Sequence, residues 1–265
     1  MEIEITVVDA FTDSVFGGNP AAVIITDEWL SDDLMQSIAA ENNLSETAFL
    51  VSEDASTYQI RWFSPLTEIT FCGHATLASA FVLFKKQTKL ASIKFSAKAV
   101  GELLVEKTEA GLVQMNFPNT KPEKVEIIPD DLSSGLSIPP VDVYCNSQAY
   151  FVVYESETEV LSVQRNNETL KKLRPRDVVV TSTAEAKNYD FISRYFWPAN
   201  GGDEDPVTGS IHTGLAPLWA ERLGKNDLVA YQASKRGGVL NCSVSGERVI
   251  ISGNAVQYLS GTITV

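Results

Sequence analysis

The beginning of the chain alternates between short apolar strands and a helix with one apolar face. Apolar and β-branched residues from Ile3 to Phe11 and from Ala21 to Ile25 predict two strands, separated by a turn-rich Gly-Asn-Pro segment. Ser31 is a typical helix N-cap, and the apolar residues after it share one face as far as Asn42. The pair Asn42-Asn43 is typical of a left-handed helix end. We therefore predict a strand, strand, helix order here.

The next segment centres on one long apolar helix. It is predicted over Gly73–Lys86, and its sequence is apolar around most of its circumference, which indicates burial within a core. Short strands punctuated by turns surround it in sequence: Glu46–Val51, Tyr58–Phe63, Ile93–Phe95, Glu102–Lys107 and Leu112–Phe117. These elements form a predicted N-terminal lobe, residues 1–118.

The rest of the chain repeats this organisation. The segment from Pro118 to Pro140 is rich in proline, serine and charge, which favours a crossing between lobes. The predicted elements that follow are strands at Val141–Val153 and Val178–Ser182, a helix near Asn166–Leu173 stopped by Pro175, an apolar helix at Gly209–Leu223 and strands from Leu228 to Val265. We predict a C-terminal lobe, 119–265, whose last strands are allowed to cross back. The fold class is α+β, with two similar lobes, each wrapping strands around a central helix.

The two apolar helices open in a similar way. The first begins Gly73-His74 and the second is expected to begin Gly209-Ser210, so each pairs a glycine with a small polar or imidazole residue. Glycine lets a ligand approach the backbone closely, and free amide groups at a helix N-terminus attract anions. We expect the two openings to face one ligand cleft between the lobes and to hold a small carboxylate.

Composition narrows the classes of partner. A formal net charge of -13 repels phosphate backbones and anionic lipids, so we expect neither nucleic acid nor a membrane as partner. The first residues alternate like a strand and lack a basic signal-peptide region, which favours a cytoplasmic location. Three widely spaced cysteines suggest neither a disulfide framework nor a zinc site.

Glu46 is a candidate general acid or base. It precedes a strongly apolar strand, where partial burial would raise its pKa toward neutrality. The alternative is a solvent-exposed strand end, or the last position of an Asn-x-x-Glu cap.

His74 is a second candidate. The positive end of the helix dipole is expected to keep its ring neutral, so that it can pass a proton or donate to a carboxylate. The alternative is a capping or core-edge histidine. The only other histidine, His212, lies inside the second helix and is expected to be packed.

The segment from Asp203 to Ser210 carries further candidates. Asp205 stands before Pro206, so it is either an N-cap or a carboxylate that meets the substrate or orients His74. Gly209 and Ser210 would supply N–H and hydroxyl donors to a carboxylate. The alternative for both is a pair of small residues where a helix packs closely.

Cys72 is a candidate for a different chemistry, because a cysteine before a helix N-terminus can have a lowered pKa and act as a base. A racemase that uses two thiols needs one on each face of the carbon, and neither Cys145 nor Cys242 lies at the second helix opening. Cys72 is then expected to be a small apolar residue behind the site.

Four motifs in order make the chain resemble the PhzF family, the isomerase-like proteins related to phenazine biosynthesis. They are Asp9-Ala10-Phe11 with Gly18-Asn19-Pro20-Ala21-Ala22-Val23, Asn43-Leu44-Ser45-Glu46-Thr47-Ala48-Phe49, Phe71-Cys72-Gly73-His74-Ala75-Thr76, and Asp205-Pro206-Val207-Thr208-Gly209-Ser210. The resemblance implies the diaminopimelate-epimerase-like fold, a homodimer, and no metal or organic cofactor.

The resemblance also implies a reaction and roles. Glu46 is similar in position to the family's acid/base, His74, Asp205 and Ser210 to its surrounding active-site groups, and Gly73 and Gly209 to backbone donors. The implied reaction is a proton shift on a small carboxylate, such as a dihydro-hydroxyanthranilate. The alternatives are a cysteine-based racemase or epimerase and a ligand-binding protein without catalytic activity.

Overall fold

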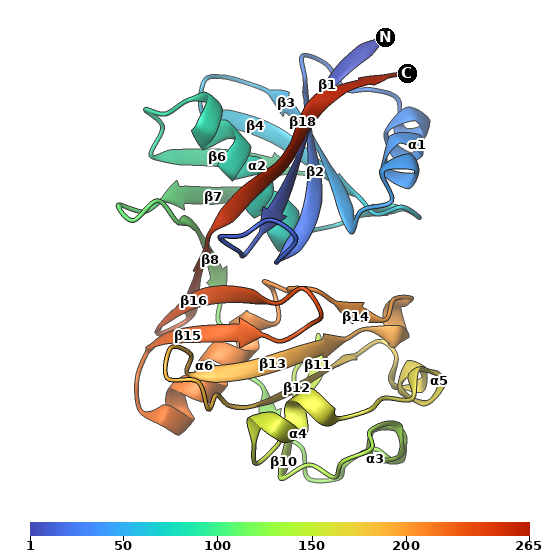
Figure 1. Cartoon of the computed structure of the whole chain (residues 1–265), viewed down its shortest axis with the longest axis vertical. Coiled ribbons are helices and arrows are strands. Elements are labelled where there is room, and N and C mark those ends of the chain that lie inside the picture. Colours follow the sequence, from blue (N-terminus) through green and yellow to red (C-terminus); the bar gives the residue numbers. More distant parts are fainter. The chain divides into compact units, whose positions relative to one another are not determined.

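The chain folds into two compact units, which are described one at a time. The computed structural model covers residues 1–265. One unit consists of Met1–Asn116 with Ser252–Val265, and the other of Phe117–Ile251 (Figure 1). The second predicted lobe, 119–265, therefore differs at its end: Ser252–Val265 belongs to the first unit, because the last strand pairs with the first strand of the chain.

The first unit is built from strands around a buried helix. Its elements are β1 (Glu2–Ala10), β2 (Asn19–Thr26), α1 (Asp32–Asn42), β3 (Glu46–Ser52), β4 (Thr57–Phe63), β5 (Glu68–Ile69), α2 (Gly73–Lys86), β6 (Ser92–Ala97), β7 (Gly101–Lys107), most of β8 (Val113–Pro118), and β18 (Ala255–Thr264). Helix α2 contacts β1, β2, β3, β7 and β18, and nearly all of its side chains are buried. Helix α1 packs on a separate group of apolar side chains from β1 to β3. Met35 and Ile38 of α1 share this cluster with Ile24 of β2 and Phe49 of β3.

Local signals set the ends of α1 as predicted. The Ser31 side chain accepts a hydrogen bond from the amide of Leu34, which satisfies one of the free donors of the first turn. Asn43 ends the helix in the left-handed region, with φ of 48°. The predicted strands on either side of α1 and α2 are present with small shifts of their ends.

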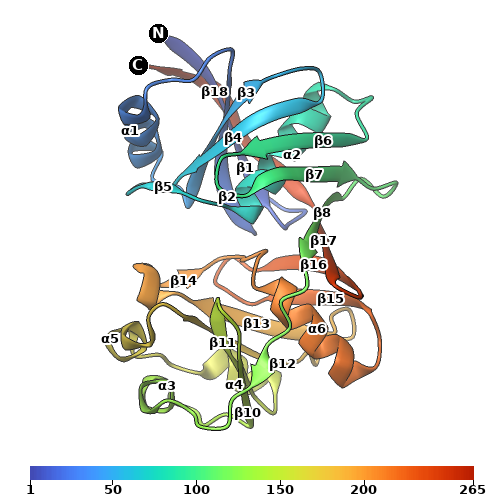
Figure 2. The ribbon, with the colours of Figure 1, turned by 180° about the vertical axis from the view of Figure 1, so that it is seen from behind.

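The second unit repeats the plan. Its elements are β9 (Glu123–Lys124), α3 (Asp130–Gly135), β10 (Asp142–Cys145), β11 (Ala149–Val153), α4 (Glu157–Ser162), α5 (Asn167–Leu170), the 3-10 turns η1 (Lys171–Leu173) and η2 (Pro198–Asn200), β12 (Asp177–Thr183), β13 (Phe191–Phe196), β14 (Glu204–Asp205), α6 (His212–Leu223), β15 (Asp227–Gln232), β16 (Gly238–Ser245) and most of β17 (Arg248–Gly253). Helix α6 contacts β15 and β16 (Figure 2). The short helices α3, α4 and α5 pack on an apolar cluster from β10 to β13.

Strand pairing shows the repeat directly. In the first unit β1–β2 is antiparallel, β2–β3 parallel, β3–β4 and β4–β5 antiparallel, β4–β6 parallel and β6–β7 antiparallel. In the second unit the same sequence of pairings runs through β10, β11, β12, β13, β14, β15 and β16. The two apolar helices occupy equivalent places, since α2 lies between β5 and β6 in sequence and α6 between β14 and β15. The predicted α+β architecture, with a helix wrapped by strands in each half, is confirmed.

Two predictions about the second half need correction. Helix α6 begins at His212, not at Gly209, because the amides of His212 and Thr213 bond to carbonyls three residues back and form tight turns first. Asp205 is not the N-cap of this helix, since it lies in β14 and Ile211 occupies the cap position. The expected crossing between Pro118 and Pro140 also contains β9 and α3.

None of the helices combines the length and apolar character that a membrane-spanning segment requires.

Candidate active site

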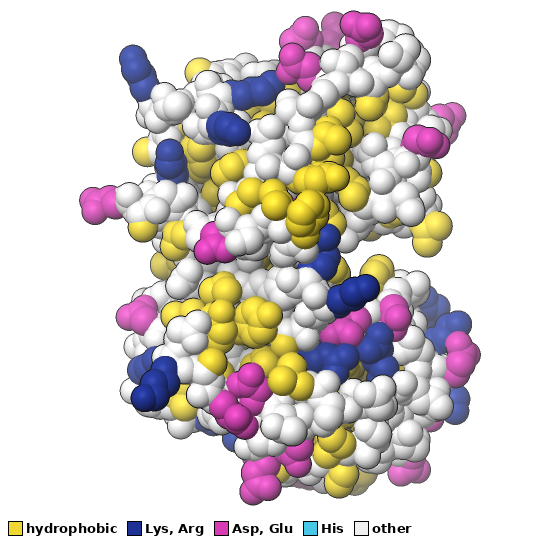
Figure 3. Space-filling view, in the orientation of Figure 1, with side chains coloured by type: hydrophobic (Ala, Val, Ile, Leu, Met, Phe, Trp, Pro, Cys, Tyr) yellow, Lys and Arg dark blue, Asp and Glu magenta, His cyan; other side chains and the backbone are white.

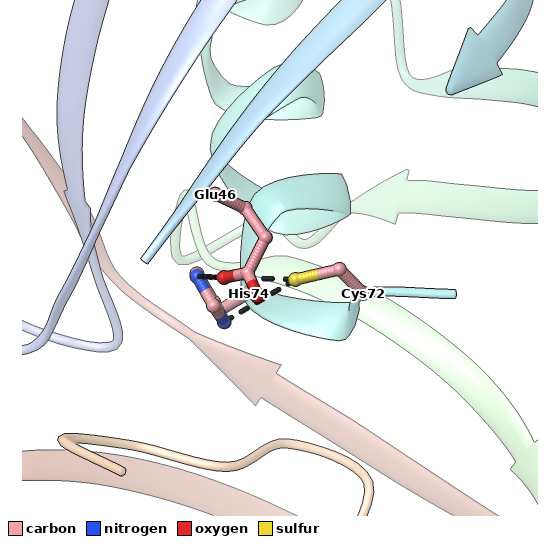
Figure 4. Close-up of side chains that lie close together, drawn as sticks. All are labelled: Glu46, Cys72 and His74. Atoms are coloured by element: carbon pink, nitrogen blue, oxygen red, sulfur yellow. Dashed lines mark hydrogen bonds and ion pairs between the residues drawn. The ribbon is translucent and has the colours of Figure 1, made fainter. Parts of the chain in front are cut away.

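Glu46, Cys72 and His74 come together in the first unit. Glu46 is the first residue of β3, while Cys72 caps the N-terminus of α2 and His74 lies in its first turn. His74 Nε2 lies 2.8 Å from Glu46 Oε2, and Cys72 Sγ lies 3.4 Å from His74 Nδ1. Figure 4 shows the imidazole next to both the carboxylate and the sulfur. The structure thus places two of the predicted catalytic residues in direct contact.

The contact between Glu46 and His74 is short but is not an aligned hydrogen bond. Glu46 Oε2 is buried and has no protein hydrogen-bond partner of good geometry, although His74 Nε2 is 2.8 Å away. We take the distance as the sign of charge pairing, because an ion pair tolerates angles that a hydrogen bond does not.

The contacts of Asn19 and Ser45 determine which ring nitrogen of His74 carries the proton when the ring is neutral. Ser45 Oγ donates to Asn19 Oδ1 over 2.8 Å, so the amide nitrogen of Asn19 faces His74 Nδ1 at 3.2 Å. An amide nitrogen only donates, which makes Nδ1 the acceptor in the neutral ring and assigns the ring proton to Nε2. In the neutral tautomer the proton is therefore on Nε2, the nitrogen that lies 2.8 Å from Glu46 Oε2.

The charge state of His74 differs from the prediction. Burial disfavours the imidazolium, yet the neighbouring Cys72 and Glu46 raise the pKa of His74 well above its ordinary value. The expectation of a neutral ring considered only the helix dipole. A carboxylate in contact with the ring outweighs a dipole of about half a charge.

Cys72 is a poor base in this position. Burial and the charge of Glu46 raise the pKa of the Cys72 thiol to about 11, although His74 opposes the change. Complete burial of the thiol here outweighs the lowering of the pKa that a helix N-terminus and the neighbouring His74 favour. The sulfur instead accepts a weak hydrogen bond from the amide of Ala75 and caps α2.

The same three residues form a possible metal-binding set. One ligand atom from each of Glu46, Cys72 and His74 lies within 4.8 Å of the others. Cysteine binds a metal as the thiolate. A metal ion here would therefore have to displace a proton that burial holds on Cys72.

Asp205 lies in the second unit and is held by its neighbours. Its carboxylate accepts a hydrogen bond from the hydroxyl of Thr208. The fully buried Gln232 of β15 accepts from the amide of Thr208 over 2.8 Å and donates to the carbonyl of Asp205 over 2.9 Å. Gln232 therefore fixes the loop from Asp205 to Thr208, which leads into the Gly209-Ser210 pair.

Ser210 is oriented by a partly buried hydrogen bond. Gln148 Nε2 donates to Ser210 Oγ over 2.9 Å. Gly209 and Ser210 form the turn before α6, so their amides belong to a turn and not to the helix as predicted.

His212 is packed, as expected. Nδ1 donates to the carbonyl of Thr208 over 2.8 Å, and Nε2 is buried without a partner. Burial lowers the pKa of His212 to about 4, so the ring is neutral at neutral pH.

Asn19, Ser45, Gln148 and Gln232 contribute to these arrangements but were not predicted as site residues. Asn19 stands in the Gly-Asn-Pro segment, which was interpreted only as a turn. Gln148 and Gln232 belong to none of the motifs, and their partners Ser210 and Thr208 lie far from them in sequence, so only the fold brings these groups together.

Comparisons with known proteins agree with this architecture. Residues 8–261 match the family model described as phenazine biosynthesis-like protein. An uncharacterised isomerase of Pseudomonas aeruginosa is 48% identical over 99% of both chains. The crystal structure of a PhzF-family protein from Enterococcus faecalis superposes with a TM-score of 0.94 and 41% identity, covering 100% of both chains.

A more distant structure shares the fold. A hydroxyproline epimerase from Agrobacterium vitis is 9% identical and has a TM-score of 0.56, covering 99% of this chain and 92% of that one. The match of the family model over residues 8–261, together with full-length relatives at this level of identity, shows that the chain belongs to the PhzF (phenazine biosynthesis-like) family.

Proposed function

We propose that the protein is a cofactor-independent isomerase that moves a proton on a small carboxylate, with Glu46 as the acid/base. The observation that carries the proposal is the half-buried Glu46 carboxylate, which lies 2.8 Å from the buried ring of His74. A carboxylate that is held in place and partly shielded from water can act as a general base toward a proton on carbon. The names of the relatives as isomerases support the same reaction class.

The proposed reaction conserves all atoms of the substrate. Glu46 removes a proton from a carbon that is allylic or alpha to the carboxylate, and the electron pair moves into the conjugated system. The protonated Glu46 then returns a proton to another carbon of that system, which shifts the double bond. The first amide groups of α2 have no acceptor within the helix, so they stabilise the negative charge that develops.

Gly73 supports this role of α2. A methyl group built on Gly73 would meet only the ring of Phe71, at 3.9 Å, which is ordinary contact. The protein's own packing therefore does not require glycine here. We infer that the glycine leaves room for a ligand next to the helix N-terminus.

The family resemblance implies that Asp205 is an active-site group beside the acid/base and that Gly209 and Ser210 bind the substrate. The bonds of Gln232 to the loop of Asp205 and of Gln148 to Ser210 hold these residues in place and support the proposal. We propose that Gly209 and Ser210 donate to the carboxylate of the substrate and that Asp205 contacts a polar substituent.

A thiol-based racemase is the second candidate, since Cys72 touches His74. Two observations disfavour it. The Cys72 thiol has a pKa of about 11, and the other two cysteines lie in β10 and β16, away from the turn before α6 in sequence. A binding protein without catalytic activity is the third candidate, and solvent exchange separates it from both enzymes.

The test is incorporation of deuterium from D2O, followed by NMR on a panel of small carboxylates that includes a dihydro-hydroxyanthranilate and several amino acids. We expect wild type to place deuterium at a C–H position and Glu46→Gln to lose about 10²–10⁴-fold in rate, the contribution of a positioned base. Glu41→Gln, which changes an exposed glutamate at the end of α1, is the matched control and should exchange at the wild-type rate.

Unchanged exchange in Glu46→Gln would rule out Glu46 as the base. Binding of a panel member without exchange by wild type would favour the third candidate.

We further propose a cytoplasmic homodimer that joins through β18. This strand pairs with β1, and the residues from Tyr258 to Thr262 are exposed. Phe16, 68% exposed, packs edge-on against Tyr258, with ring centroids 5.7 Å apart. Apolar side chains gather on this face of the first unit (Figure 3). Exposed aromatic and aliphatic residues on a strand are typical of an interface between copies of a chain.

A further inference from the structure

The repeat in strand pairing gives Glu46 a counterpart in the second unit. In the first unit Glu46 begins β3 and lies opposite Ala21 of the parallel strand β2. In the second unit Asp177 begins β12 and lies opposite Ala149 of the parallel strand β11. Both units therefore place a carboxylate at the same position of the same pair of strands.

Asp177 has a different environment from Glu46, because no histidine contacts it. It is 7% exposed, and its two oxygens accept from Tyr195 Oη over 2.7 Å and from Asn200 Nδ2 over 2.8 Å. Burial raises the pKa of Asp177, and the hydrogen bonds from Tyr195 and Asn200 oppose this change only in part. Burial and the charge of Asp177 raise the pKa of Tyr195, so the tyrosine keeps the proton that it donates to Asp177.

The hydroxyl proton of Tyr195 determines the orientation of the side-chain amide of Gln148. The single hydroxyl proton of Tyr195 points at Asp177, so the Tyr195 oxygen can only accept from Gln148, whose Nε2 lies 3.4 Å away. The same amide nitrogen lies 2.9 Å from Ser210 Oγ. The reversed amide would set two acceptors against each other at Tyr195, so the network favours the orientation in which Nε2 faces Tyr195 and Ser210.

The backbone of Gln148 is held as firmly as its side chain. Its amide donates to Asn146 Oδ1 over 2.8 Å, and its carbonyl accepts from the amide of Asp177 over 3.0 Å. Asn146 in turn donates through its side chain to the carbonyl of Thr120 over 2.9 Å. Hydrogen bonds thus hold both the backbone and the side chain of Gln148.

The chain of hydrogen bonds determines what the Ser210 hydroxyl does. Its oxygen accepts from Gln148, so its own proton points elsewhere and is ready to be donated. A hydroxyl whose proton is not used within the protein can donate it to an anion such as a carboxylate.

We propose that Gln148, held by Tyr195 and Asp177, is a positioning residue that keeps the Ser210 hydroxyl as a donor to the carboxylate of the substrate. The inference rests on the proposed function for the class of substrate. It adds to the site a partly buried chain of hydrogen bonds, from Asp177 through Tyr195 to Gln148, whose residues lie outside the four sequence motifs. In this proposal Asp177, which occupies the position equivalent to Glu46, supports substrate binding and does not transfer a proton.

The test is a double-mutant cycle on binding, with anthranilate and 1-cyclohexene-1-carboxylate as probes in isothermal titration calorimetry. We expect Ser210→Ala to weaken binding of a probe about tenfold, the loss of one hydrogen bond to a charged group. Gln148→Leu should weaken it by a similar factor, and the double variant by no more than Ser210→Ala alone. Gln148→Glu, of the same shape but accepting from Ser210, should weaken binding at least as much as Gln148→Leu.

Gln164→Leu is the control, because Gln164 is an exposed amide of the same unit, and it should bind as wild type. Thermal unfolding of each variant identifies any that fail to fold, and in that case the remaining Gln148 variant carries the test. Wild-type affinity in both Gln148 variants, or losses that multiply in the double variant, would overturn the inference.

The outcome also separates this inference from the proposed function. Coupled losses at Gln148 and Ser210, without Glu46-dependent exchange, would support this role of Gln148 and contradict the isomerase. Exchange that depends on Glu46, with no effect of Gln148, would do the reverse. Failure of wild type to bind either probe would count against both.

Discussion

At the scale of single residues, the site depends on which groups hold protons. Glu46 contacts a ring whose pKa is raised, while the neighbouring Cys72 thiol keeps its proton because it is buried beside a carboxylate. Asn19 fixes the neutral tautomer of His74. These contacts favour acid/base chemistry through Glu46 and leave Cys72 as a helix cap.

Cys72→Ser tests that assignment. Serine is a better N-cap than cysteine and can accept from the amide of Ala75, so stability should be unchanged or slightly higher. We expect deuterium exchange within about threefold of wild type, because the change removes no group that is asked to carry a proton. A loss as large as that of Glu46→Gln would favour the thiol-based racemase.

His212 predicts how stability depends on pH. Its folded-state pKa of about 4 lies below the 6.5 of an unfolded histidine, so its contribution is complete above pH 6.5 and is lost as the pH falls toward 4. Between pH 7 and pH 5 this amounts to about 2 kcal/mol for a fully buried ring. The raised pKa of His74 acts oppositely: its contribution is complete below pH 6.5 and is lost only as the pH rises through the folded value.

The measurement is the free energy of unfolding in urea at pH 7 and pH 5, for wild type and His212→Asn. Asparagine can donate to the carbonyl of Thr208 but does not titrate, so the drop between the two pH values should be about 2 kcal/mol smaller in the variant. A constant loss of stability from the smaller side chain does not affect this difference. Equal drops in the two proteins would show that His212 is not the titrating group.

At the scale of elements, the two helix openings differ in a way that the motifs do not reveal. Helix α2 begins at Gly73, as predicted, and its first amides lie in the helix itself. The Gly209-Ser210 pair lies in a turn before α6, which is fixed by Gln148 and Gln232 from other strands and loops. One opening is therefore set by local sequence and the other by distant amides.

Gly73→Ala tests the opening of α2. Alanine is favoured over glycine in a helix by roughly 0.5–1 kcal/mol, and the added methyl would meet only the ring of Phe71, at 3.9 Å. We expect equal or higher thermal stability together with a loss of affinity for the carboxylate probes of tenfold or more. Unchanged affinity would mean that no ligand approaches the backbone here, whereas a loss of stability would point to a packing role for the glycine.

At the scale of the whole molecule, two features stand out: the repeated order of strand pairs and the exposed C-terminal strand β18. The same order of strand pairs serves both units, yet one carries a glutamate with a histidine and the other an aspartate with a tyrosine. The C-terminal strand returns to β1, so the two ends of the chain stabilise one unit together.

Tyr258→Asp tests the homodimer. Tyr258 is 55% exposed, so the change costs little in the monomer but buries a charge in an interface through β18. We expect light scattering after size exclusion to give twice the chain's 28.9 kDa for wild type and a shift to monomer for the variant. Lys89→Asp, an exposed position outside β18, serves as the control. A monomeric wild type, or a dimer that Tyr258→Asp leaves intact, would contradict the proposed interface.

The sequence by itself determined the local elements, the fold class and the family. Ser31 and Asn43 set the ends of α1, the apolar run set α2, and four motifs identified the PhzF family, because caps, periodicity and motifs act over a few residues. Tertiary structure alone decided the contacts between residues far apart in sequence: Asn19 with His74, Gln232 with the loop of Asp205, and Gln148 with Ser210.

The tertiary structure also decided that α6 begins after Gly209, that Ser252–Val265 joins the first unit, and that the ring of His74 has a raised pKa. The physical reason is the same in each case. Burial, charge pairing and amide orientation depend on neighbours that folding brings together, and no local pattern of apolar and polar residues records them.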